Sequence, residues 1–309
     1  MISRLQIIML AVVLSVGLTD AVWAFAGHFD IDAPAYAGLA LLSAALAAGG
    51  IYYDRIRAEP GLSAMLIGAG FMIAFSAAFS VFNMLLLTVS AHRIDYALAA
   101  IDRSLGFYWP AMVAWSTEHP LVNLVLRIAY TSVLPQIALM ILCLGTRPME
   151  IYRFCFAVMA GAAMAIGVWA FARAMGTLTV YELPRSLADH ISLACDPEYG
   201  RQMIWMAAHG PGHISPSDTK GLIAFPSYHA VLALLVAWHA RKLAVIRWIA
   251  LALNAVVLVA TPIQGGHHVV DVFAGAVTAV LAILFSNAVL AYAARARPLR
   301  FAGPEPATS

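Results

Sequence analysis

The sequence predicts an all-α integral membrane protein, a polytopic bundle of about eight transmembrane helices. Of its 309 residues, 62% are hydrophobic and only 11% are charged. The mean hydropathy of +0.84 lies far from the mixture that keeps a globular surface in water. Apolar runs close to the length of about 20 residues that crosses the hydrocarbon core recur along the whole chain.

The expected spans, in chain order, are 5–26, 34–52, 64–90, 119–143, 152–175, 223–240, 245–263 and 268–293. The first of them, followed by small residues, also fits a cleavable signal peptide. We favour a retained helix, because many further spans follow it.

Two connections, 91–118 and 176–222, are too polar to be simple spans, and we expect both to lie at the membrane interface. The first resembles an interfacial amphipathic helix, with Tyr108, Trp109 and Trp115 at the depth of the lipid headgroups. The expected organisation is therefore as follows: N-terminal transmembrane helices at 1–90, a second membrane domain at 91–300 with these two loops, and a polar tail at 301–309.

The distribution of positive charge predicts the orientation, because Lys and Arg in short loops favour the cytoplasmic side. If the spans alternate, one side receives Arg4, Arg55, Arg57, Arg147, Arg153, Arg241, Lys242, Arg247, Arg295, Arg297 and Arg300. We therefore expect both termini in the cytoplasm, with the two long loops on the opposite side.

Charge and cysteine content exclude two classes of protein. The net charge is +2 and no basic run is longer than Arg241-Lys242, so no nucleic-acid partner is expected. Of the three cysteines, Cys143 and Cys155 lie in apolar runs and Cys195 stands in a polar loop, so a disulfide framework is not indicated.

The expected sixth span opens with FPSYH, residues 225–229. Proline suits a first helical turn, because its missing N–H would have had no partner there. A helix start presents free N–H groups and a partial positive charge that suit an anion, and the Ser227 hydroxyl adds a donor. The pattern favours a phosphate-binding helix start, although Ser227 and His229 also fit a plain cap and an interfacial residue.

The expected eighth span opens with GGHHVVD, residues 265–271. His267 and Asp271 are four residues apart and so lie on one helix face. A carboxylate there can fix the imidazole tautomer with the far nitrogen free, which makes a histidine a competent nucleophile or base. Gly266 lets the backbone approach a ligand closely. Asp271 alone could equally complement the helix dipole.

Span parity brings these two motifs together. The sixth and seventh spans run down and back, so we expect His229 and His267 to meet at the non-cytoplasmic face in one phosphate-handling site. Two alternatives stay open: zinc bound by the histidines with Asp271, and a hydrolase that uses Ser227, which lacks the flanking glycines of a strained nucleophile elbow. We favour a site without metal or cofactor.

In order and spacing, these residues resemble the phosphatidic acid phosphatase type 2 (PAP2) superfamily. Its second motif is Pro-Ser-any-His, and its third places a His four residues before an Asp. The segments FPSYHA and NAVVLVATPIQGGHHVVDVFAG are similar to the branch that includes inositolphosphorylceramide synthases and their bacterial relatives. The upstream residues that share this resemblance, which covers roughly 90–285, are Asp95, Asp102, Leu105-Gly106-Phe107, Trp109, Tyr130 and Gln136.

The resemblance implies a role for each motif residue. His267 would attack phosphorus to give a phosphohistidine, Asp271 would orient and charge-balance it, and His229 would protonate the leaving oxygen. Ser227 and Gly266 would bind the phosphoryl group, and no metal would be needed. Residues that would shape a lipid-headgroup pocket are Asp102, Tyr130 and Gln136.

The chain departs from the superfamily pattern in its cations. The first motif, a Lys then six residues then Arg-Pro, is not present in that form, and Ala260-Thr261 stands where the third motif has Ser-Arg. Arg and Lys supply much of the charge complement of phosphate sites. The expected replacements are Lys220 and Arg201, before PSYH, and Arg127 in the fourth span, where an ionisable residue is a functional candidate by default but also fits a snorkelling arginine.

The function expected from these residues is cleavage or transfer of the phosphoryl group of a phosphorylated lipid, at the outer face of what we expect to be the bacterial inner membrane. Hydrolysis and transfer differ only in whether water or an alcohol attacks the intermediate. The alternative is a lipid transporter or binding protein that keeps the fold without catalysis. The expected partners are the lipid substrate and the bilayer, and nothing in the sequence sets an oligomeric state.

Overall fold

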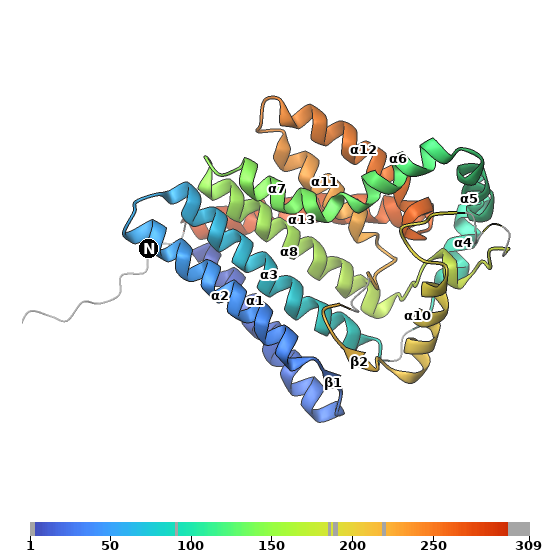
Figure 1. Ribbon diagram of the computed structural model, residues 1–309, viewed down its shortest axis with the longest axis horizontal. Helices are drawn as coiled ribbons and strands as arrows, with labels where there is room; N and C mark the ends of the chain where they lie inside the picture. The colour runs from blue at the N-terminus through green and yellow to red at the C-terminus, as the bar shows by residue number, and fades with distance from the viewer. Residues whose placement is uncertain (1–3, 90–91, 185–186, 188–190, 218–220, 296–309) are drawn as a thin grey trace, which may run out of the picture.

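The computed structural model describes residues 4–89, 92–184, 187, 191–217 and 221–295. The fold is nearly all-α, as predicted, with 77% of it helical (Figure 1). The elements are α1 (Arg4–Gly27), β1 (Asp30–Ile31), α2 (Ala33–Arg55), α3 (Pro60–Leu86), α4 (Asp95–Ser104), α5 (Trp109–Glu118), α6 (Pro120–Thr131), α7 (Val133–Cys143), α8 (Pro148–Phe171), η1 (Thr177–Thr179), α10 (Glu198–His209), β2 (His213–Ile214), α11 (Tyr228–Ala240), α12 (Ile246–Gly265) and α13 (Val269–Arg295).

Six of the described helices, α1, α2, α3, α8, α12 and α13, are long and apolar enough to cross a membrane. The pair α6 and α7 makes a seventh span if the two helices are counted together across their 52° bend. The remaining expected span is represented by α11, which has 13 residues and is too short to pass the same test. The membrane helical bundle is confirmed, whereas the count of eight is not.

The bend between α6 and α7 falls at Ser132, inside the expected single span 119–143. Pro135 explains it. Proline has no N–H to donate to the carbonyl of Thr131, four residues earlier, and its ring collides with that carbonyl in a straight helix. The span is therefore broken where the sequence pattern predicts a continuous one.

Pro226 disfavours helical geometry at Phe225, the residue before it, and the backbone of Ser227 is extended, so α11 begins only at Tyr228. Ser227 is the N-cap, and its side chain accepts a hydrogen bond from the N–H of Ala230. Pro226 thus lies just outside the helix and not in its first turn as expected.

The interfacial segment 91–118 forms two helices, α4 and α5, and not one amphipathic helix. They are separated at Gly106, whose φ of +88° lies in the left-handed region that favours glycine. Tyr108 and Trp115 are about half exposed, whereas Trp109 is buried against other parts of the protein. The second loop, 176–222, contains η1, α10 and β2.

The centre of the bundle is α8, which packs against α3, α11 and α13 (Figure 1). Small residues permit this: a Cβ at Gly161 would lie 2.7 Å from the Val231 side chain of α11. Outside the bundle, β1 pairs with β2 in parallel, and His213 Nδ1 lies 2.8 Å from Asp30 Oδ2. The α1–α2 hairpin is thereby attached to the segment that leads into α11.

Candidate functional site

The starts of α11 and α13 are in direct contact. The N–H of Ser227 donates to the carbonyl of Asp271 at 3.0 Å. Gly275, one turn further along α13, leaves room for this approach, because a Cβ there would collide with the carbonyl of Ser227. The two sequence motifs therefore share one site.

His267 is almost fully buried, and its Nδ1 has two acceptors nearby. It lies 2.9 Å from the carbonyl oxygen of Ala224 and 3.4 Å from Oδ2 of Asp271. A carbonyl oxygen can only accept, so the neutral ring carries its proton on Nδ1. The lone pair of Nε2 is therefore free, which is the form that a nucleophilic histidine requires.

His229 faces His267, with 6.3 Å between the ring centroids. Tyr130, from α6, stacks on the His229 ring at a centroid distance of 4.2 Å, and its hydroxyl lies 3.3 Å from Nδ1 of His229. A tyrosine hydroxyl that donates to Nδ1 leaves the ring proton of His229 on Nε2. Tyr130 therefore belongs to the site as a contact of His229.

Asp271 both lies beside His267 and caps a helix start, the two roles that its sequence position suggested. Its side chain is fully buried, and Oδ2 accepts the backbone N–H of His268 at 2.8 Å while facing His267. The same carboxylate thus caps the start of α13 and lies beside the imidazole.

Gly266 ends α12 in the left-handed conformation, with φ +63° and ψ 34°. Its carbonyl accepts the N–H of Thr177 at 2.7 Å. Gly176, at φ +92°, is also required here, because a Cβ on it would collide with the carbonyl of Gly266. The close neighbour of Gly266 in the structure is thus another segment of the chain, and the approach of a ligand there stays a prediction.

Asp102 points at the backbone of α13. Its carboxylate accepts the N–H of Val269 at 2.7 Å and of Val270 at 3.0 Å. Burial alone would raise the pKa of the Asp102 carboxyl, but the neighbouring His268 and the two N–H groups outweigh burial and lower that pKa below its ordinary value. The carboxylate is therefore ionised and fully engaged.

Gln136 is also engaged with the protein. Its Nε2 donates to Ser132 Oγ at 2.9 Å, and its Oε1 accepts from Asn254 of α12 at 2.7 Å. The three residues predicted to share a headgroup pocket thus have three different sets of neighbours: α13 for Asp102, His229 for Tyr130, and Asn254 for Gln136.

A comparison with known families agrees with this geometry. The model of the PAP2 superfamily matches residues 96–285, more than half of the chain. The chain belongs to the PAP2 superfamily. The match does not distinguish branches, so the likeness to inositolphosphorylceramide synthases is not confirmed by it. Neither a curated protein nor a solved structure matches the chain.

Three cations are predicted to replace those missing from the PAP2 motifs, and the structure describes two of them. Lys220 lies outside the described residues. Arg201 is exposed on α10, and Glu198 both pairs with it and raises its pKa. Arg127 donates to Ser192 Oγ and stands three residues before Tyr130 on α6, close to one helical turn from the residue that stacks on His229. Of the two described arginines, Arg127 is the one that shares a helix with a residue that contacts His229.

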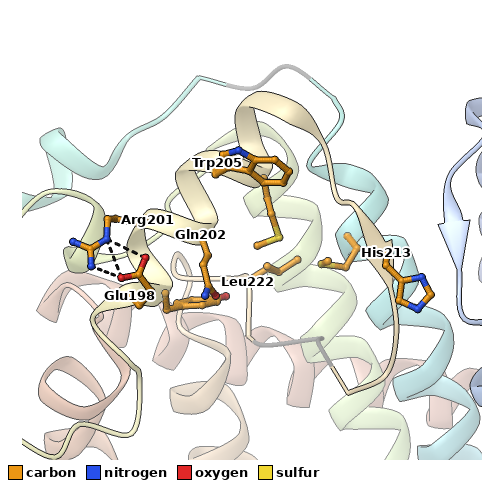
Figure 2. Close-up of a pocket in the computed structure, with 9 residues that line it drawn as sticks. Glu198, Arg201, Gln202, Trp205, His213 and Leu222 are labelled. Carbon is orange, nitrogen blue, oxygen red and sulfur yellow. Dashed lines mark hydrogen bonds and ion pairs between the residues drawn. The ribbon is translucent and has the colours of Figure 1, made fainter.

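Arg201 lines a hollow of about 590 Å³ beside α10 (Figure 2). Figure 2 shows the Glu198–Arg201 pair at one side of this hollow and His213 at the other. Its described lining includes neither His229 nor His267. This hollow is therefore separate from the PAP2 site.

Sequence reasoning missed two supports of the PAP2 motifs, and it named a third without its contact. One is the Ala224 carbonyl, for which no side-chain signal exists. Another is Gln264, directly before GGHH, which donates to Asn123 Oδ1 at 2.6 Å and accepts from the N–H of Ala194. The third is Trp109, whose Nε1 donates to the Pro262 carbonyl at 2.8 Å. The position of Gln264 directly before GGHH is a signal that could have indicated it. Trp109 lies 153 residues before Pro262, so the sequence gives no sign of that contact.

The described residues contain no group of three His, Cys, Asp or Glu side chains arranged to hold a metal ion. In the neutral ring of His267, Nδ1 donates to the Ala224 carbonyl and is not free to coordinate. The geometry thus gives the zinc alternative no support beyond the residue types.

Proposed function

We propose that this PAP2 protein cleaves or transfers the phosphoryl group of a phosphorylated lipid through a phosphohistidine on His267. One observation carries the proposal: His267 is held through Nδ1 by the Ala224 carbonyl with Asp271 behind it, and its ring faces His229 across 6.3 Å. A binding protein has no evident need for one oriented histidine opposite a second.

In the first step, the Nε2 lone pair of His267 attacks phosphorus and the bond from phosphorus to the lipid oxygen breaks. His229, as the imidazolium whose Nδ1 donates to the Tyr130 hydroxyl, gives its Nε2 proton to the leaving oxygen and becomes neutral. Proton transfer of this kind typically contributes roughly 10²–10⁴-fold to the rate. Asp271 balances the positive charge that the His267 ring acquires. In the second step, water or an alcohol loses its proton to His229 and attacks phosphorus, which frees His267.

The phosphoryl oxygens are bound, in this proposal, by the Ser227 hydroxyl and the start of α11. Arg127 supplies positive charge from α6, where it stands three residues before Tyr130. A guanidinium that leaves Ser192 for a phosphate would gain two charge-assisted hydrogen bonds.

We further propose that the site opens to the outer leaflet, because the Lys and Arg residues of the short loops fall on the other side. The resemblance to the inositolphosphorylceramide synthase branch favours transfer to an alcohol over hydrolysis. The substrate class is the same in both cases, a lipid that carries a phosphate ester.

A lipid panel tests the proposal. The purified protein in detergent is incubated with phosphatidic acid, phosphatidylglycerophosphate, an isoprenyl diphosphate and phosphatidylinositol, with and without an added polyol or lipid alcohol. We expect phosphate release or headgroup exchange on at least one lipid, lost in His267→Ala and kept in His209→Ala, which changes an exposed histidine of α10. Saturable lipid binding with no turnover on any member would instead support the binding-protein alternative.

A chelator arm separates the metal alternative. Activity that survives chelation supports the phosphohistidine route, whereas activity that disappears with chelator and returns with added zinc would reassign the histidines to a metal site.

A further inference from the structure

Helix α4 carries two buried carboxylates, Asp95 and Asp102, seven residues apart and so close to one helical face. Both bind backbone N–H groups. Asp95 Oδ1 accepts from Met175 at 2.7 Å and from Gly176 at 2.9 Å, and Asp102 accepts from the first two residues of α13. One short helix therefore fixes four backbone N–H groups in two distant segments.

These two segments lie on either side of His267. The first reaches Gly266, the residue before the histidine, because Thr177 follows Gly176 and donates to the Gly266 carbonyl at 2.7 Å. The second segment, Val269–Val270, begins two residues after the histidine.

The apolar face of α4 contacts a third support of the same histidine. Leu98, between the two carboxylates in sequence, belongs to a buried cluster with Ala174, Ala224 and Val270. Ala224 is the residue whose carbonyl holds Nδ1 of His267. The same ten-residue helix therefore hydrogen bonds to, or packs against, three segments that contact His267 or lie beside it in the sequence.

The charges of Asp95 and Asp102 suit them to hold the backbone beside His267. Asp95 pairs with Arg93 at 3.0 Å, and Oδ2 of Asp102 lies 3.7 Å from Nδ1 of His268. A carboxylate that accepts N–H groups makes hydrogen bonds roughly twice as strong as a neutral acceptor does. Two such acceptors hold the backbone more firmly than packing alone.

We infer that Asp102, supported by Asp95, is a positioning residue that sets the direction from which His267 attacks phosphorus. The effect on attack by His267 rests on the proposed function, whereas the fixing of the backbone by Asp102 rests on the structure alone. A misplacement of about 1 Å can cost about 10²-fold in rate, so loosening the start of α13 should slow the chemical step and leave lipid binding largely intact.

The test compares Asp102→Asn, which keeps the shape and one acceptor, with Asp32→Asn, which replaces the carboxylate that caps α2 through the N–H of Ala35. Asparagine caps as well as aspartate. We expect Asp102→Asn to lower kcat by about 10²-fold with KM changed by less than about 3-fold, and Asp32→Asn to change neither. Hydrogen exchange of peptides that cover 262–272 should accelerate by about 10-fold or more in Asp102→Asn only.

The exchange measurement needs no substrate, so it separates failure of this inference from failure of the proposed function. A wild-type protein that turns over no phosphorylated lipid contradicts the proposed function, and the exchange result still decides whether Asp102 fixes this backbone. Asp102→Asn with wild-type kcat, a loss confined to KM, or unchanged exchange at 262–272 overturns the inference. If Asp102→Asn does not fold, Asp102→Glu takes its place, and failure of both to fold would assign Asp102 to stability alone.

Discussion

The two helix starts that form the site differ in how their N–H groups are capped. At α13, the carboxylates of Asp102 and Asp271 accept the N–H groups of three consecutive residues, His268 to Val270. At α11, the cap is the neutral hydroxyl of Ser227. Both helices have the same partial positive charge at their start. At α13 the two carboxylates neutralise this partial charge. At α11 no described carboxylate caps the helix start.

This difference assigns the two starts different tasks. At α13, three N–H groups already bind two carboxylates and are not available to a phosphate, which suits a segment that positions the nucleophile His267. A start with a neutral cap attracts an anion, which suits the phosphate. In the proposed function, the histidine that attacks and the serine that binds therefore belong to different helix starts.

The largest expected loss of activity comes from placing a carboxylate at the start of α11, as at the start of α13. Ser227→Asp keeps a good helix cap but adds a carboxylate where the phosphate should bind, and Ser227→Asn keeps the cap without charge. We expect kcat/KM of Ser227→Asp to be about 10²-fold or more below that of Ser227→Asn, since like charges at one site cost several kcal/mol. Equal kcat/KM values in the two variants would show that phosphate does not bind at α11.

A smaller effect is expected at Tyr130, which holds His229 on the α11 side. Tyr130→Phe keeps the stacked ring and removes one hydrogen bond, a contribution of about 1 kcal/mol, so kcat should fall roughly 5-fold. Tyr228→Phe is the matched control, because its hydroxyl donates to the Val158 carbonyl of α8. A kcat that falls equally in both variants would indicate a general loosening of α11 and no specific contact.

The smallest effect is a dependence of stability on pH at the α13 start. The pKa of Asp102 is lowered in the folded protein, so its contribution is present above the unfolded pKa of about 3.9 and is lost as the pH falls through the folded value. The thermal midpoint of the wild type in detergent should exceed that of Asp102→Asn at pH 6, and the gap should close towards pH 3. A gap that is constant over this range would contradict an ionised Asp102.

The sequence predicts the fold class and the meeting of His229 with His267, because apolar runs and span parity are one-dimensional patterns. It misjudges the spans where proline acts locally: Pro135 breaks one, and Pro226 shortens another. These effects depend on which carbonyl or which preceding residue the ring meets, and a hydropathy pattern does not register them.

The supports of the site were harder to predict for a different reason. The resemblance assigns Asp102 and Tyr130 to a headgroup pocket, and in the structure they contact the α13 backbone and His229. Ala224 was not predicted at all, because its carbonyl is common to every residue. Contacts between segments more than 40 residues apart, such as Ala224 with His267, become visible only in three dimensions.

The central claim is that His267 carries the phosphoryl group. The most direct test is to trap the intermediate: His229→Ala is mixed with a ³²P-labelled lipid phosphate that the wild type turns over, quenched in alkali, digested and mapped. We predict a label that is stable in alkali and labile in acid, on the peptide that contains His267, and no label in the double variant His229→Ala/His267→Ala. A label on another residue, or on the double variant, would contradict the account.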